Sequence, residues 1–217
     1  MNNFYIASLP LFICLLISFC VNKRLNKPWL KFFPLYLLLK SITEFVAYNY
    51  SAITHHSNHF IINLVFLLDF PFYFFVFYKV FNDQKYKKLT LLFSLIFLGF
   101  YIYNIGFNQG FRYINSYTFS LGSLFLIITS LIYFVQVFNS DKEINYFRIP
   151  MFWISTGIMF NYVCNLIYWS LVGYIIANHV DPDGFIFGVV LTISNLVLYG
   201  FISIGFLSNI QWNQKRL

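Results

Sequence analysis

Residues 60–80 read FIINLVFLLDFPFYFFVFYKV and indicate what kind of protein this chain is. The stretch holds one acid, Asp69, and one base, Lys79, and as a helix it is long enough to cross the roughly 30 Å hydrocarbon core of a bilayer. The rest of the chain is similar, because 59% of its 217 residues are hydrophobic and 10% are charged, against about 25% charged in soluble domains. The composition excludes a water-soluble enzyme and predicts an integral membrane protein.

Six further apolar runs accompany this one. The sequence therefore predicts an all-α fold, in which residues 1–217 form a single domain of seven transmembrane helices. The predicted spans are 4–21, 32–53, 60–80, 89–107, 117–138, 149–177 and 185–207. The first run lacks preceding basic residues and a small-residue cleavage site, so we interpret it as a retained span and not as a signal peptide. The fourth run is almost entirely apolar and is expected to face lipid.

Basic residues fall almost entirely on one side of this predicted topology. By the positive-inside rule the basic side is cytoplasmic, which puts the N-terminus outside and the C-terminus inside. The net charge of +7 is explained by this asymmetry, and we expect no nucleic-acid partner. Only Arg112 falls in a loop on the opposite side, and Lys40 lies within a span. The other twelve of the 14 are Lys23, Arg24, Lys27, Lys31, Lys79, Lys85, Lys87, Lys88, Lys142, Arg148, Lys215 and Arg216.

Three charged residues inside predicted spans need a physical account. A charged side chain at the bilayer centre costs at least about 2.5–3.5 kcal/mol on insertion scales. Lys40 and Glu44 are four residues apart and share a helix face, so we expect them to neutralise each other. Asp69 has no base nearby in sequence and is expected to be the uncompensated acid. At 1.5 Å per residue, Glu44 and Asp69 lie about 18 Å and 13 Å from opposite membrane surfaces, which puts them at nearly the same depth.

Amide side chains in the sixth and seventh spans fall near that same depth. The sequence therefore predicts a polar cluster that responds to a ligand, an ion or a proton. Close packing of helices through small and amide residues is the alternative interpretation. The candidate site residues are Lys40, Glu44, Asp69, Asn161, Asn165 and Asn195.

No pattern typical of an enzyme is present, and we expect neither catalysis nor a cofactor. Zinc-hydrolase, nucleophile-elbow, P-loop and dinucleotide-binding motifs are all absent from the sequence. Three histidines crowd one predicted outer loop, and one histidine and two aspartates lie in another, which is chemistry that suits Zn²⁺. We expect these side chains to be hydrated and to hold no metal. They are His55, His56, His59, His179, Asp181 and Asp183.

Three segments carry a resemblance to a known group of proteins. The run 148–160, RIPMFWISTGIMF, is similar to a P-x-F-W-I-x-x-G segment found in small bacterial seven-helix proteins and in the seven-helix sensory regions of membrane histidine kinases. Residues 63–70 are similar to the N-L-x-x-x-x-E-F segment of that group, and residues 114–117 to its I-N-S-Y segment. Asp69 departs from the usual Glu, and Asn161 stands where an aromatic residue is more common.

The resemblance implies a sensor-like or accessory module of a bacterial cytoplasmic membrane. Such a module acts through a partner chain, such as a separate kinase or the subunits of a membrane complex. A second hypothesis is a seven-helix transporter of a small solute or ion, which should show matching helix breaks in its two halves. Pro10 in the first span has no counterpart in the fifth, which argues against it. A third hypothesis, a structural subunit of a larger complex, predicts a flat apolar face and no pocket.

Overall fold

The computed structural model describes residues 3–139 and 145–210, with side chains from residue 8 onward. In this part of the chain every long element is helical: α1 (Asn3–Val21), α2 (Phe33–Thr54), α3 (His59–Val80), α4 (Gln84–Tyr103), α5 (Ser116–Phe138), α6 (Pro150–Ala177) and α7 (Phe185–Ser208). The predicted all-α fold is confirmed. Five of these helices, α3 to α7, are long and apolar enough to cross a membrane. The full seven-span topology and its orientation stay predictions.

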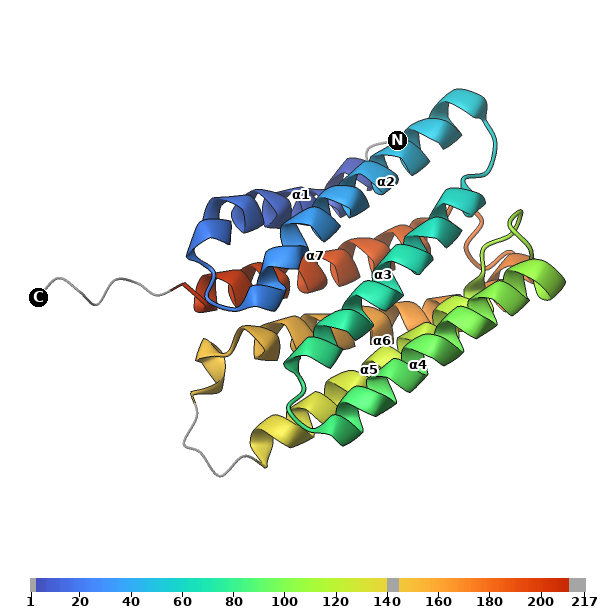
Figure 1. Ribbon diagram of the computed structural model, residues 1–217. Helices are drawn as coiled ribbons and strands as arrows, with labels where there is room; N and C mark the ends of the chain where they lie inside the picture. The colour runs from blue at the N-terminus through green and yellow to red at the C-terminus, as the bar shows by residue number, and fades with distance from the viewer. Residues whose placement is uncertain (1–2, 140–144, 211–217) are drawn as a thin grey trace, which may run out of the picture.

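The helices run back and forth between two ends of an elongated bundle (Figure 1). Helices α6 and α7 form its most extensive contact, α5 packs on the other side of α6, and α1 packs between α7 and α2. Two glycines allow the close approach of α6 and α7. A Cβ on Gly157 would lie 3.1 Å from the carbonyl oxygen of Leu198, and one on Gly205 would lie 3.0 Å from that of Pro150. Small residues at a helix interface are typical of membrane bundles, because they let the backbones touch.

Helix boundaries differ from the predicted spans mainly in α4. We expected Lys85, Lys87 and Lys88 in a loop, but they lie in the first turns of this helix. The helix starts early because the Asp83 side chain accepts a hydrogen bond from the Lys85 amide (2.8 Å) and caps the N-terminus. Most of α4 is not buried in the bundle, and its facing lipid stays a prediction.

Every described basic residue that was assigned to the cytoplasmic side lies at one end of the bundle, on the left in Figure 1. That end is named the basic end below. The α2–α3 connection and Arg112 lie at the opposite end. Lys142, Lys215 and Arg216 fall outside the described residues.

We predict that the two ends face opposite sides of the membrane. In a background with Cys14, Cys20 and Cys164 replaced by Ser, Ser57→Cys at the α2–α3 end should react with a membrane-impermeant maleimide added to intact cells. Lys87→Cys at the basic end should react only after the cells are opened. Reaction of both cysteines in intact cells would refute the orientation.

Candidate functional site

The three charged residues that were predicted at mid-depth meet in the structure. Lys40 Nζ lies 2.5 Å from Asp69 Oδ2 and 3.7 Å from Glu44 Oε1. The predicted pairing was therefore wrong in one respect, because Asp69 is the closer partner of Lys40 and is not uncompensated. Spacing along α2 reveals only the partner on the same helix, whereas the long lysine side chain reaches across to α3. With both acids ionised, the cluster carries a formal charge of −1.

Hydroxyl groups hold both carboxylates in place. Tyr36, one turn before Lys40 on α2, donates to Asp69 Oδ1 (3.0 Å), and its oxygen lies 3.0 Å from that of Tyr73. Ser8 on α1 donates to Glu44 Oε2 (3.3 Å). The cluster thus joins α1, α2 and α3. The side chains of Lys40 and Asp69 are 9% and 13% exposed, and that of Glu44 is 20% exposed, so Glu44 is the more accessible acid.

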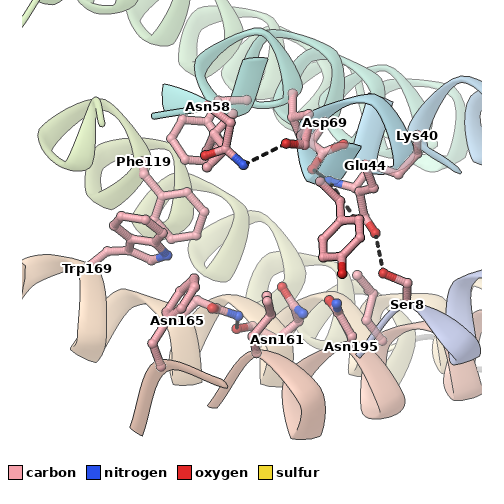
Figure 2. Close-up of a pocket in the computed structure, with 18 of the residues that line it drawn as sticks. Ser8, Lys40, Glu44, Asn58, Asp69, Phe119, Asn161, Asn165, Trp169 and Asn195 are labelled. Carbon is pink, nitrogen blue, oxygen red and sulfur yellow. Dashed lines mark hydrogen bonds and ion pairs between the residues drawn. The ribbon is translucent and has the colours of Figure 1, made fainter. Parts of the chain in front are cut away.

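A cavity of about 680 Å³ adjoins this cluster. All six predicted site residues line it, and Figure 2 shows the charged groups of α2 and α3 facing the asparagines of α6 and α7. From there the cavity extends along the last turns of α2 to His55 and Asn58, at the end away from the basic residues. Its walls are otherwise largely apolar, with Phe119 and Trp169 labelled in Figure 2. Concave apolar walls with a few polar groups are typical of small-molecule sites, and this volume lies in their usual range.

The three asparagines do not have the same surroundings. Asn165 Nδ2 donates to Ser194 Oγ and to the carbonyl oxygen of Asn161, both at 2.9 Å, so it helps to join α6 to α7. This contact agrees with the alternative interpretation of the asparagines, in which amide side chains pack the helices together. The Asn161 side chain lines the cavity and makes no hydrogen bond to any described residue. Asn195 also lines the cavity and is 8% exposed.

Several residues of the site were missed by sequence reasoning. Tyr36 lies four residues before Lys40 and shares its helix face, so helical spacing could have found it. Ser8 is an ordinary residue in an apolar run and gives no such signal. Phe119 and Trp169 lie far apart in sequence, on the consecutive helices α5 and α6, and their rings lie 5.5 Å apart only because α5 packs on α6.

The connections at the end away from the basic residues contribute to the cavity without forming a metal centre in the part of the chain that is described. No group of three or more His, Cys, Asp or Glu is positioned there to hold a metal ion. His55 ends α2 in a left-handed conformation (φ 55°) and lines the cavity. His59 Nδ1 lies 2.8 Å from the carbonyl oxygen of Arg112, which ties the start of α3 to the α4–α5 connection. The absence of a metal in the protein stays a prediction.

Asp181 organises the start of α7 beside the cavity wall. Its carboxylate accepts hydrogen bonds from the amides of Ile186 (3.0 Å) and Phe187 (2.9 Å) and from the Tyr168 hydroxyl (3.3 Å). Desolvation acts to raise the pKa of Asp181, but these hydrogen bonds outweigh it and lower the pKa below its ordinary value. Because Phe187 lines the cavity, Asp181 helps to position one of its walls.

Comparison with known proteins identifies no relative. No protein-family model matches the chain, and neither the curated proteins nor the solved structures include a significant match. The geometry of the site therefore carries the functional argument.

We predict a defined order of destabilisation among cluster variants. Lys40→Met should cost the most, about 3–5 kcal/mol, because it leaves two buried carboxylates without their cation. Asp69→Asn should cost less, since Glu44 remains 3.7 Å from Lys40, and Glu44→Gln should cost roughly 1 kcal/mol or less because an amide can keep the Ser8 bond. Thermal unfolding in detergent, followed by circular dichroism, measures the order. Lys88→Met, an exposed lysine on α4, is the control and should change stability by less than about 0.5 kcal/mol.

We also predict that Asp181 stabilises the first turn of α7 only while it is ionised. Asp181→Ala should speed hydrogen exchange at the amides of Ile186 and Phe187 at neutral pH, and Asp183→Ala, which removes a neighbouring acid, should not. Because the folded-state pKa is lowered, the stabilisation is fully present above the unfolded value of about 3.9 and is lost as pH falls through the folded value. Equal exchange in both variants would show that the cap has no such role.

Proposed function

We propose that this chain is a non-enzymatic membrane protein that binds a small molecule in the cavity and reports the bound state to a partner protein. The observation that carries the proposal is the cavity itself, which is enclosed by α1, α2, α3, α5, α6 and α7, has apolar walls and ends on a buried charged cluster. A structural subunit gives no reason for such a cavity, so the cavity favours binding over a purely architectural role.

The charges favour one chemical class of ligand. Glu44 is the more exposed acid, it lies farther from Lys40 than Asp69 does, and the cluster has one more acid than base. A cationic or strongly hydrogen-bond-donating head group would pair with Glu44, and the Asn161 amide oxygen would accept a second hydrogen bond. Phe66, Phe119 and Trp169 offer aromatic faces, which attract cations and pack well against an apolar body.

The seven-span topology, the outward-facing mouth and the bacterial cytoplasmic membrane are parts of this proposal. The positive-inside distribution supports an orientation in which the cavity mouth faces the outside of the cell. Described connections between helices are short. Output through a partner that contacts the basic end is therefore the simplest route, and the resemblance to kinase-linked sensory regions supports the same reading.

Binding can be tested with a matched pair of probes. Tryptamine and indole-3-propionate are similar in size and opposite in charge. We predict that tryptamine raises the unfolding temperature of the wild-type protein and that indole-3-propionate does not, because a ligand that binds only the folded state stabilises it. Glu44→Gln should remove the shift, and Asp183→Asn, which removes an exposed acid outside the cavity, should leave it unchanged. Equal loss of the shift in both variants, or equal shifts from the two probes, would refute the assignment of the cavity.

A transporter is the second candidate, because two helices that contribute to the site contain a proline. Pro10 lies in α1 two residues after Ser8, and Pro71 lies in α3 two residues after Asp69. Helix breaks beside the binding site are typical of transporters built from two repeats, where they occur at matching positions of the two halves. Both prolines here lie in the first half of the chain, so the matching pair is lacking among the described helices. Proteoliposomes that contain the purified protein distinguish the candidates. A receptor should bind tryptamine without speeding its entry into the vesicles, whereas uptake that is lost in Glu44→Gln would establish transport.

A further inference from the structure

A second cavity, of about 600 Å³, lies at the basic end of the bundle. Four separate segments build it: the α1–α2 connection, the end of α3, the end of α5 and the start of α6. It shares no residue with the first cavity. The residues that line it are Lys27, Trp29, Lys79, Val80, Asn82, Tyr133, Gln136, Val137, Arg148, Ile149, Pro150 and Met151.

The charges on its wall are all of one sign. Lys27, Lys79 and Arg148 line the cavity, and no carboxylate does so among the residues that the structure describes. None of the three cations forms an ion pair with a described residue; Lys79 Nζ lies 5.5 Å from the centre of the Phe75 ring. Helix α6 begins here while α3 and α5 end here, so the helix ends leave a net partial charge of about −0.5, which the three full positive charges outweigh.

Neutral groups on the wall add hydrogen-bond donors. Tyr133 and Asn82 line the cavity, and their side chains make no hydrogen bond within the described chain. Gln136 also lines it, and its buried carbonyl oxygen has no partner in the described residues. That oxygen only accepts hydrogen bonds, so it would pair with a water molecule or a hydroxyl group of the ligand and not with a phosphate oxygen.

We infer that this second cavity is a binding site for a phosphate-bearing anion. Three cations on separate segments can surround a phosphate from several sides, and arginine offers paired N–H groups that match phosphate oxygens. The volume exceeds what a single inorganic ion needs and suits a phosphorylated head group with its hydration. Two sources share this chemistry: an anionic phospholipid of the adjacent leaflet and a soluble phosphate compound. Trp29 on the wall is a residue type enriched at membrane–water interfaces, which places the site at the depth of lipid head groups.

The test compares two triple variants that lose the same charge. Lys27→Gln, Lys79→Gln and Arg148→Gln together remove the cations of the cavity. Lys23→Gln, Arg24→Gln and Lys87→Gln remove three cations from the same end that do not line it. Each protein is placed in nanodiscs of equimolar phosphatidylglycerol and phosphatidylcholine, and retained lipid is measured by native mass spectrometry. Binding of radiolabelled pyrophosphate is measured separately in detergent.

We expect the wild-type protein to retain phosphatidylglycerol in preference to phosphatidylcholine, to bind pyrophosphate, or both. Attraction worth about fivefold for each basic residue predicts a loss of roughly a hundredfold in the cavity variant. The control variant should lose at least tenfold less. Lipid retention alone identifies a phospholipid, and pyrophosphate binding alone identifies a soluble phosphate compound.

Two results would overturn the inference. Equal losses in the two triple variants would show diffuse surface attraction without a site, and a wild-type protein that binds neither probe would show no anion site at all. Circular dichroism of both variants at the start confirms that each is folded. Since both leaflets are open in a nanodisc, the outcome does not depend on the proposed orientation or on the first cavity.

Discussion

The ion pair between Lys40 and Asp69 constrains the rest of the bundle. Removing two charges from water costs several kcal/mol per ion, and their attraction offsets this only when geometry is good and the remaining oxygens are hydrogen-bonded. Both conditions are met, since Lys40 contacts Oδ2 of Asp69 while Tyr36 donates a hydrogen bond to Oδ1. Any shift of α2 along α3 breaks these contacts together. The pair therefore fixes the register of the two helices more strictly than apolar contacts could, because lipid is as apolar as the side chains it would replace.

This requirement explains why a cavity lies where it does. One face of α2 contacts α1 and α3 through Tyr36, Lys40 and Glu44. Helices α6 and α7 pack tightly against each other because Gly157 and Gly205 leave room for their backbones. The half of α2 away from the basic end lies across the cavity from α6 and α7. The residues that it presents to the cavity include the small side chains of Ala47, Ser51 and Ala52. Small side chains on that surface do not fill the space between the helices. The cavity is thus a consequence of two strong local packing requirements at different places in the bundle.

The sequence predicted the features that depend on a single helix, namely its position in the chain and the depth of its side chains. Seven apolar runs correspond to the seven described helices, and depth counted at 1.5 Å per residue brought Glu44 and Asp69 to the same level and into one cluster. The equal depth also predicted that both acids lie within reach of Lys40. That Asp69 is the closer partner was not predictable, since it depends on how α2 crosses α3. Asn63 and Asn115 show the same limit. In the sequence these two residues stood out only because they fall in the segments that resemble the seven-helix group. In the structure the Asn63 side chain accepts a hydrogen bond from the Asn115 amide (3.0 Å) and donates one to the Tyr113 carbonyl oxygen (2.9 Å), which joins α3 to the start of α5.

Helix α3 connects the two cavities physically. Asp69 lies at the charged end of the first and Lys79 on the wall of the second, ten residues or about 15 Å apart on one helix. Pro71 lies between them and removes one backbone hydrogen bond of the helix, which is where a helix bends most readily. Position between two sites is not coupling, which requires an element with two arrangements that both sites bias. Helix α3 has the features that such an element needs: a charge that a ligand can compete for, a weakened turn, and a second charge beyond that turn. A cationic ligand that displaced Lys40 from Asp69 would have to supply the free energy lost with that ion pair. The displacement would remove the main restraint on α3 at the turn just before Pro71, and Lys79 lies on the same helix about two turns beyond that proline.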